Sequence, residues 1–163
     1  AAKKLGSVIV VYSPKGGVGC TTISTNLAIS LISENNEVIL VDGNPQYGDV
    51  AVFLNMKTRH FLNDITPRVD DLDEEIVTNI VSTHTLTGLV VIAAPPSVEY
   101  ADQVQGEQFG NLLDFLRGMY DYIVVDTNSY LSDVVLSSLT IADIIILISS
   151  QDIPSFKLSL PAL

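Results

Sequence analysis

The segment Ser13–Thr22, with the sequence SPKGGVGCTT, constrains the fold of this chain more than any other feature. An apolar run precedes it at Val8–Tyr12, and a stretch of helical pattern follows at Thr21–Ser33. Glycines at a strand-to-helix turn let backbone N–H groups approach phosphate oxygens, and the helix N-terminus adds the positive end of its dipole. The segment therefore predicts a phosphate-binding loop inside a β-α unit.

Length and composition indicate one globular domain without a membrane span. With 163 residues and 47% hydrophobic content, the chain is long enough to bury a sizeable core. Its apolar runs, such as Ile144–Ile148, are about five residues long, whereas a helix needs roughly 20 to cross a bilayer. Lys3 and Lys4 lead directly into a short strand and then Pro14, which is not a secretory signal pattern. We expect a cytoplasmic protein.

Charge and cysteine content narrow the classes of function. The net charge is −11 and the pI is near 4.2, which argues against direct binding to DNA or anionic lipid, because both need a basic surface. The single cysteine excludes an intramolecular disulfide and a cysteine-based zinc site. Much of the charge lies in Asp70–Glu75, which is typical of the first turn of a helix; a patch that docks a partner is the alternative.

Short apolar runs alternate with segments of helical pattern along the chain. The runs expected to form strands of a buried parallel sheet are Val8–Tyr12, Val38–Val41, Leu89–Ala93, Tyr122–Val125 and Ile144–Ile148. The expected helices are Thr21–Ser33, Leu72–Val81, Gln108–Met119 and Tyr130–Thr140. This alternation predicts an α/β fold with a doubly wound, mainly parallel sheet and helices on both faces.

Phosphate binding gives a role to each part of the loop. The Thr21 hydroxyl is expected to bind Mg²⁺, Thr22 to reach another phosphate, and the backbone amides to surround the β-phosphate. A glycine-rich turn that packs without ligand is the alternative. The residues predicted to form this cradle are Gly16, Gly17, Val18, Gly19, Cys20, Thr21 and Thr22.

Two carboxylates follow apolar strands. Asp42 ends the run that begins at Val38, and Asp126 ends the run that begins at Tyr122. Ligands of such sheets bind at the carboxyl ends of the strands. An apolar strand that ends in Asp is also the Walker B pattern, in which Asp126 acts on Mg²⁺ through water. Asp42 and the nearby Asn44 are alternatively simple turn residues.

The pattern Lys-Gly-Gly-x-Gly-x-Thr-Thr at Lys15–Thr22 resembles the deviant Walker A loop of the MinD/ParA family of ATPases. The resemblance implies that Lys15 is the family's signature lysine, which contacts nucleotide by reaching across a sandwich dimer to the partner's phosphates. It implies ATP or ADP and Mg²⁺ as ligands, and a homodimer that forms on ATP binding. Asp42 then holds the hydration shell of Mg²⁺, completing a metal site with Thr21 and Asp126.

Two departures from the family pattern weaken hydrolysis. The ordinary P-loop lysine falls on Cys20, and a neutral thiol cannot replace an ammonium that faces triphosphate. Asn44 stands where the family has the Asp that orients or activates the attacking water, and an amide accepts a hydrogen bond from water without taking its proton. Asn44 and Lys15 are the candidate catalytic residues. We expect retained nucleotide binding with slow or absent turnover.

Other segments are similar to the pilus-assembly branch of the family, the CpaE/TadZ-like proteins. They are Asp42–Leu54, Ala93–Pro96 and Asp126–Asp133, together with the Gly-Cys-Thr-Thr of the loop. The branch implies a localisation factor that marks a cell pole or a secretion apparatus, with pilus, secretion or polar-localisation proteins as partners and recruitment to the membrane or pole. The family's γ-phosphate-sensing segment contains Gly, but Asn128–Tyr130 does not, so switching is expected to differ.

Two other functions stay open. One is a genuine ATPase, with Lys15 supplied across a dimer, that acts in chromosome or plasmid partition or in septum-site placement. The other is a nucleotide-free scaffold, although such a scaffold has no need of Thr21, Asp42 and Asp126.

The expected organisation is a linker at residues 1–6 followed by one P-loop ATPase-like domain at residues 7–163. The sequence stops soon after its fifth predicted strand, whereas doubly wound nucleotide domains usually continue with further β-α units. We therefore expect a C-terminally incomplete domain from a longer protein.

Overall fold

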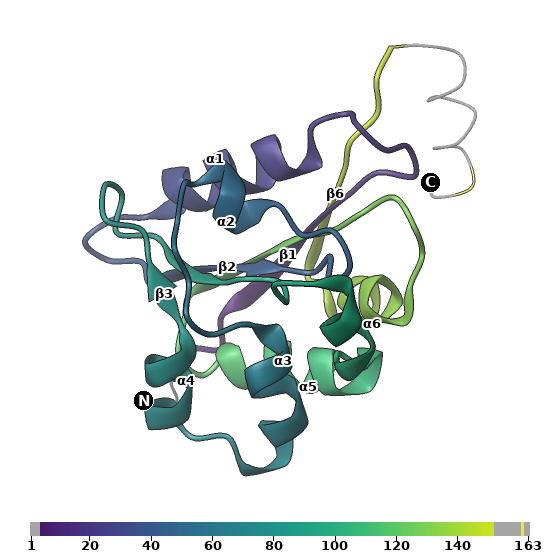
Figure 1. Cartoon of the computed structure of the whole chain (residues 1–163). Helices are drawn as coiled ribbons and strands as arrows, with labels where there is room; N and C mark the ends of the chain where they lie inside the picture. The colour runs from purple at the N-terminus through teal and green to yellow at the C-terminus, as the bar shows by residue number, and fades with distance from the viewer. Residues whose placement is uncertain (1–3, 152–160, 162–163) are drawn as a thin grey trace.

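A computed structural model of the chain describes residues 4–151 and 161. In this part of the chain, six strands form one sheet in the order β3-β4-β2-β5-β1-β6 (Figure 1). Their bounds are β1 (Ser7–Tyr12), β2 (Val38–Asp42), β3 (Ser82–Thr83), β4 (Val90–Ile92), β5 (Tyr122–Asp126) and β6 (Ile144–Leu147). All neighbours are parallel except β3, which runs antiparallel to β4. The predicted mainly parallel sheet is confirmed.

Helices cover both faces of the sheet, as predicted. Helices α1 and α2 lie above the sheet in Figure 1, and α3 to α6 lie below it. The helices of the described residues are α1 (Cys20–Leu31), α2 (Val50–Phe53), α3 (Leu62–Ile65), α4 (Glu74–Ile80), α5 (Gly106–Leu116) and α6 (Asp133–Ile141), with 3-10 helices η1 (Thr66–Asp71) and η2 (Val98–Gln103).

The hydrophobic core is divided into two parts by the sheet. In β1, Val8 and Val10 pack with residues of α5 and α6 such as Phe109, while Val11 packs on the opposite side with Ala28 of α1. This alternation follows from the two-residue period of a strand, and it explains why continuously apolar strands are needed here. Because β1, β2 and β5 are parallel neighbours, their carboxyl ends lie at the same edge of the sheet. The polar residues that follow these strands therefore lie close together.

The predicted helices are present with shifted ends, and two of them have N-caps that explain where they begin. Asp73 precedes α4 and accepts a 2.7 Å hydrogen bond from the backbone N–H of Ile76. The acidic run 70–75 therefore spans η1 and the first turn of α4, as its composition predicts. Ser132 caps α6, which begins three residues later than predicted.

Strand β6 differs from its predicted environment. Ile144 and Ile145 are about half exposed, at 50% and 51%, whereas the apolar run predicted burial on both faces. The reason is that β6 pairs only with β1 and forms an edge of the described sheet. Continuous apolarity indicated a strand correctly but did not give its position in the sheet.

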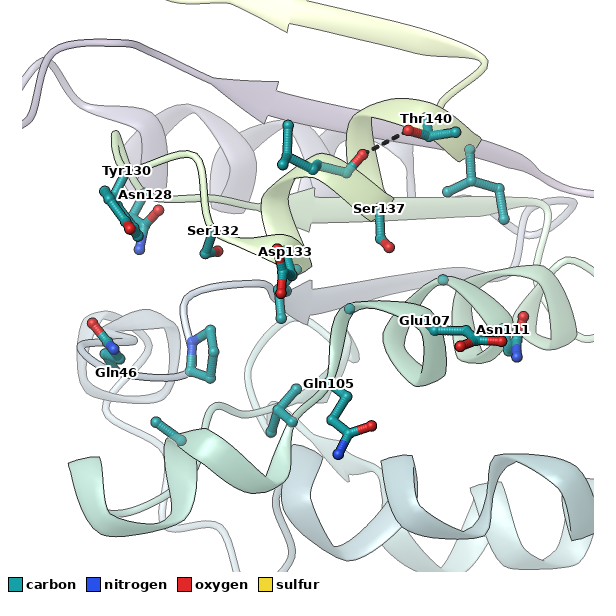
Figure 2. Close-up of a pocket in the computed structure, with 18 of the residues that line it drawn as sticks. Gln46, Gln105, Glu107, Asn111, Asn128, Tyr130, Ser132, Asp133, Ser137 and Thr140 are labelled. Carbon is teal, nitrogen blue, oxygen red and sulfur yellow. Dashed lines mark hydrogen bonds between the residues drawn. The ribbon is translucent and has the colours of Figure 1, made fainter.

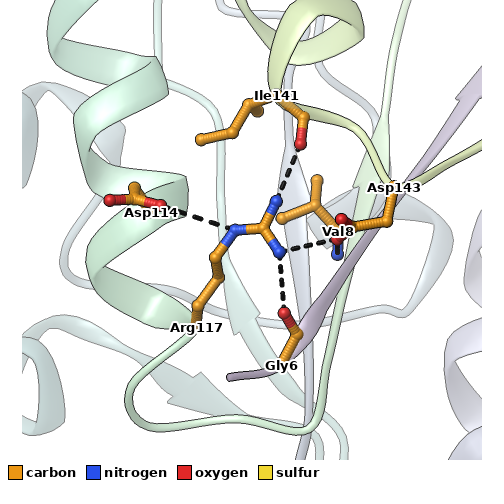
Figure 3. Close-up of polar contacts among 6 residues, drawn as sticks. All are labelled: Gly6, Val8, Asp114, Arg117, Ile141 and Asp143. Atoms are coloured by element: carbon orange, nitrogen blue, oxygen red, sulfur yellow. Dashed lines mark hydrogen bonds and ion pairs between the residues drawn. The ribbon is translucent and has the colours of Figure 1, made fainter. Parts of the chain in front are cut away.

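Arg117, just after α5, connects three segments of the fold (Figure 3). Its Nη1 donates to the Gly6 carbonyl at 2.8 Å and to Asp143 Oδ2 at 2.6 Å, and its Nη2 donates to the Ile141 carbonyl at 2.8 Å. The same Asp143 oxygen accepts from the backbone N–H of Val8. Gly6, assigned to the linker from the sequence, is thus buried within the fold; linker residues 1–3 lie outside the described residues.

None of the helices within residues 4–151 combines the length and apolarity that a membrane crossing requires.

Candidate functional site

The loop between β1 and α1 has the backbone that phosphate binding needs. Gly17 and Gly19 have φ angles of 75° and 99°, a region that side-chain-bearing residues rarely adopt. Gly19 is the N-cap of α1, where no side chain accepts a hydrogen bond from the helix and no acidic residue lies in the first turn. The first backbone N–H groups of a helix lack partners within it, so this end of α1 presents donors and a positive dipole end to an anion.

This helix end opens into a cavity of about 370 Å³. The loop forms one wall, and residues that follow β2 and β5 form the other. The lining residues are Lys15, Gly16, Gly17, Val18, Gly19, Cys20, Thr21, Thr22, Asn44, Asp49, Thr127, Asn128 and Ser129. All eight loop residues predicted to bind nucleotide therefore line one cavity, together with the catalytic candidate Asn44.

Thr21 lines the cavity and contacts Asp126, which is not itself among the cavity-lining residues. Thr21 Oγ1 donates to Asp126 Oδ2 at 2.7 Å, and Ser24 Oγ donates to Asp126 Oδ1 at 2.9 Å. Asp126 is almost fully buried, and burial raises the pKa of its carboxyl, while the two hydroxyl donors act in the opposite direction. The structure thus brings together two of the three predicted magnesium residues, and their oxygens are the hard ligands that Mg²⁺ prefers.

Asp42, the third predicted magnesium residue, pairs in register with Asp126 on the neighbouring strand. Its side chain is buried and does not line the cavity. The backbone N–H groups of Asn44 and Val50 donate to its two carboxyl oxygens at 3.1 and 3.2 Å. Burial, and secondarily the charge of Asp126, raises the pKa of Asp42 to about 8. In this arrangement Asp42 holds the loop that carries Asn44 and Asp49.

Asn44 is fixed by a neighbour from the next strand of the sheet. Its Oδ1 accepts two hydrogen bonds, one from Asn128 Nδ2 at 2.9 Å and one from the backbone N–H of Tyr47 at 3.3 Å. The Oδ1 of Asn128 is buried and has no hydrogen-bond partner among the described residues. The two amides therefore join the loop after β2 to the loop after β5 at the rim of the cavity.

Cys20 and Lys15 differ in what they offer a phosphate. Burial, with a further contribution from the charge of Asp126, raises the pKa of the Cys20 thiol to about 11, so the thiol is neutral near pH 7. Lys15 lines the same cavity, and its backbone N–H donates to Ser13 Oγ at 3.2 Å. Among the cavity-lining residues, Lys15 is the only one with a cationic side chain.

Sequence reasoning missed Ser24 and Asp49 as site residues, and it named Asn128 only as part of the segment that corresponds to the family's γ-phosphate sensor. Ser24 lies three residues after Thr21, so both side chains project from one face of α1, which was a usable signal. Asp49 lines the cavity and contributes to raising the pKa of both Asp42 and Asp126, but nothing in its local sequence marks it.

The residues present fit a magnesium-bound nucleoside phosphate. An uncapped helix end faces a cavity, two glycines hold the loop in a left-handed conformation, and a Thr hydroxyl lies beside a carboxylate. The arrangement lacks a second lysine at the first position of α1, where Cys20 stands. Its chemistry is anion binding by backbone amides, with hydroxyl and carboxylate oxygens for a divalent cation.

Comparison with known proteins agrees with this geometry. A family model described as an AAA domain matches residues 6–157. The chromosome partitioning protein ParA of Myxococcus xanthus is 31% identical over 149 residues, which cover 88% of this chain and 52% of that protein. The chain spans about half the length of the curated relatives it matches.

Solved structures show the same fold. A ParA family ATPase from Chlorobium tepidum superposes with a TM-score of 0.87 at 25% identity, covering 94% of this chain and 64% of that chain. The septum site-determining protein MinD from Pyrococcus horikoshii, solved with Mg-ADP, superposes with a TM-score of 0.83 at 20% identity over 97% of this chain and 63% of that one. The chain therefore belongs to the MinD/ParA superfamily of P-loop ATPases.

Proposed function

We propose that this chain binds ATP or ADP with Mg²⁺ and acts as a nucleotide-gated localisation factor with slow or absent hydrolysis. The observation that carries the proposal is the uncapped N-terminus of α1, which faces a cavity of about 370 Å³. The first residue of this helix is Cys20, whose neutral thiol stands where the P-loop pattern has a lysine. The MinD of Pyrococcus horikoshii, which has this fold, was solved as a complex with Mg-ADP.

Each residue of the site has a defined task in this proposal. The amides of residues 16–22 hold the phosphates, and Thr21 with Asp126 holds Mg²⁺, which supplies charge neutralisation of the phosphates when bound. Asp42 sits behind this pair and holds its loop through the backbone of Asn44 and Val50. These groups account for binding without any contribution from the side chain of Cys20.

Two substitutions keep hydrolysis slow. The Cys20 thiol carries no positive charge to oppose the charge that develops on the phosphoryl group, and the loss of such preorganised groups costs about 3 kcal/mol in other enzymes. Asn44 has no proton-accepting carboxylate, and its Oδ1 is already occupied by Asn128 and Tyr47.

ATP binding is proposed to produce a homodimer in which Lys15 of each copy reaches the partner's phosphates. Apolar side chains at the rim of the site give this dimer a surface: Tyr47, Val52 and Phe53 are 68%, 78% and 50% exposed, while Val50 and Leu54 of the same segment are buried in the core. Asp49, immediately before α2, lines the cavity, so this surface borders the nucleotide.

The cellular role proposed first is localisation of a pilus or secretion apparatus, with recruitment of this cytoplasmic protein to the membrane or a cell pole. The segments that resemble the CpaE/TadZ-like branch support it, because Asn44, Cys20 and Asn128 all lie in them. A role in chromosome partition or septum placement is the second candidate. The 31% identity to a chromosome partitioning protein favours that alternative.

The proposal is tested by binding of a fluorescent ATP analogue with Mg²⁺, with phosphate release recorded on the same sample. Binding without release supports the localisation switch, and steady release makes the protein a working ATPase despite Cys20 and Asn44. Absence of binding overturns the proposal and leaves a nucleotide-free scaffold. Thr21→Val should remove the magnesium dependence of binding, whereas Thr78→Val, on the exposed face of α4, should not.

Dimerisation is tested separately by sedimentation with a slowly hydrolysed ATP analogue. Lys15→Ala should keep the protein monomeric, while Lys57→Ala, which removes an exposed cation outside the cavity, should leave the dimer intact. A Lys15→Ala protein that dimerises as well as the unmodified chain contradicts the role of Lys15 across the dimer.

A further inference from the structure

A second cavity, of about 1090 Å³, lies between α5 and α6 on the face of the sheet opposite α1 (Figure 2). It is distinct from the nucleotide cavity, although Asn128 lines both. Figure 2 shows Glu107 and Asn111 on α5 and Asp133, Ser137 and Thr140 on α6, on the two sides of this groove.

Small residues create the groove. Gly106 and Gly110 lie one helical turn apart on α5 and face Asp133 and Ser137, which are one turn apart on α6. A Cβ on Gly106 would lie 2.6 Å from the Asp133 carbonyl oxygen, so the two helices touch there through backbone. A Cβ on Gly110 would lie 3.7 Å from Ser137 Cβ, which is an ordinary van der Waals contact, so the two helices are less tightly packed at that position than at Gly106.

The walls of the groove carry one sign of charge. Four exposed carboxylates line it, and none of its lining residues is Lys, Arg or His. The four are Asp102, Glu107, Asp114 and Asp133. Asp114 lies 3.5 Å from Arg117 Nε, while the other three make no ion pair or hydrogen bond through their side chains with any described residue.

Helix stability explains only part of this charge. Glu107 lies in the first turn of α5 and Asp133 begins α6, and acidic residues are favourable at both places. Asp102, in η2, and Asp114, near the end of α5, are not at such positions. All four carboxylates nevertheless line the same groove, where their negative electrostatic potentials add and attract cations.

We propose that this groove docks a basic segment of a partner protein, with at least two Arg or Lys side chains against the acidic walls. Glu107 and Asp133 are the central contacts. Tyr130 and Leu136, which line the same groove and are 71% and 47% exposed, give the segment apolar contacts at its edge. A second copy of this chain is a poor occupant, because the groove calls for a basic segment and the chain has only 8 Lys and Arg residues against 19 Asp and Glu.

The proposal is tested with a fluorescein-labelled synthetic peptide of alternating Ala and Arg with one central Leu, titrated with the 163-residue chain without nucleotide. The peptide in which Glu replaces every Arg is the charge control. Omitting nucleotide keeps the result independent of the function proposed above. Fluorescence anisotropy should show binding of the Arg peptide that weakens with added salt, and no binding of the Glu peptide.

Matched variants separate the groove from the general acidity of the protein. Glu107→Gln with Asp133→Asn should weaken binding about tenfold, because each removed carboxylate faces a cation in a hollow. Asp70→Asn with Glu75→Gln removes the same charge from exposed positions outside the groove and should weaken binding less than about twofold. Equal losses in the two variants, or no binding of the Arg peptide, overturn the proposal.

Amide chemical shifts of the unmodified chain provide a test that needs no variant. Adding the Arg peptide should move the signals of Gly106, Gly110 and Ser137 most. Shifts centred instead on the acidic run at 70–75 overturn the proposal, as does self-association of the chain through the groove with the peptide unbound.

Discussion

The side-chain amide of Asn128 donates a 2.9 Å hydrogen bond to Oδ1 of Asn44, joining two loops whose residues are 84 positions apart. Asn44 also accepts from the backbone of Tyr47, so its oxygen is already engaged at the rim of the nucleotide cavity. A water molecule near the phosphates would have to compete with both donors for that oxygen.

Asn44→Asp tests whether this position limits hydrolysis. A carboxylate there has a second oxygen free to accept the water proton, and Asn128 can still donate to the first. Steady-state phosphate release should rise about tenfold or more, within the range that general-base catalysis contributes. The control is Asn79→Asp, which adds the same charge on the exposed face of α4. An unchanged rate in the Asn44 variant would mean that another step or group limits turnover.

Cys20→Lys tests the missing local cation. Cys20 is the first residue of α1 and lines the cavity, and its thiol is neutral near pH 7. An ammonium at this position should tighten ATP binding by about tenfold to a hundredfold, since charge-assisted contacts to phosphate are worth roughly 1.5 to 3 kcal/mol. Cys20→Ala is the control and should bind ATP as the unmodified protein does. Titration calorimetry measures both, and equal affinities for Lys and Ala variants would show that charge at this position was never limiting.

Two glycines of α5 give a matched pair for stability. Gly106→Ala places a Cβ 2.6 Å from the Asp133 carbonyl oxygen, so α5 and α6 must separate, and we expect a loss of about 1 to 3 kcal/mol in the free energy of unfolding. Gly110→Ala meets Ser137 at an ordinary 3.7 Å and replaces glycine inside a helix, so stability should stay level or rise by up to about 1 kcal/mol. Urea unfolding of both variants checks this order, and the reverse order would contradict the close contact at Gly106.

Local patterns in the sequence predicted the parts of this molecule that depend on local physics. Three glycines and two threonines between an apolar run and a helical pattern define the loop, because left-handed backbone at Gly17 and Gly19 needs glycine wherever the loop occurs. Asp126 could be placed beside Thr21 because parallel strands end at one edge of a sheet.

Features that depend on long-range packing were not predictable from the same patterns. Strand β3 has two residues, and α2 and α3 have four each, too few to show a period. The burial of Asp42 depends on the loop after β2, which folds back so that the backbone N–H of Val50 donates to the carboxyl of Asp42. The contact between Gly106 and Asp133, which shapes the second groove, arises only when α5 and α6 pack.

The pH dependence of stability should show the unusual state of Asp42. Its pKa is raised to about 8 from the ordinary value of 3.8, so the folded protein favours the protonated carboxyl. The contribution of this group is fully present below about pH 4 and is lost as the pH rises toward 8. Without nucleotide or Mg²⁺, the melting temperature of the unmodified chain should therefore fall over this range more steeply than that of Asp42→Asn. Parallel curves for the two proteins would contradict the raised pKa.

Arg117 lies outside both cavities, and its loss should destabilise the fold. Replacement by Leu leaves the carbonyl groups of Gly6 and Ile141 without their donor, and buried unsatisfied groups cost about 1 to 3 kcal/mol each, so we expect a loss of about 2 to 4 kcal/mol. Arg117→Lys keeps the charge but not the fork that reaches three acceptors, and should retain part of the stability.

Asp143, which accepts a hydrogen bond from Arg117, should make the stability of the fold depend on pH in the acid range. The hydrogen bond from Arg117, with that from the Val8 N–H, lowers the pKa of Asp143 below its ordinary value of 3.8. Its contribution to stability is therefore present above about pH 4 and is lost as the pH falls through the lowered pKa. Asp143→Asn should remove this loss, so denaturant unfolding between pH 2 and 5 should show a flatter acid limb for the variant. An acid limb that is identical in both proteins would mean that other carboxylates set it.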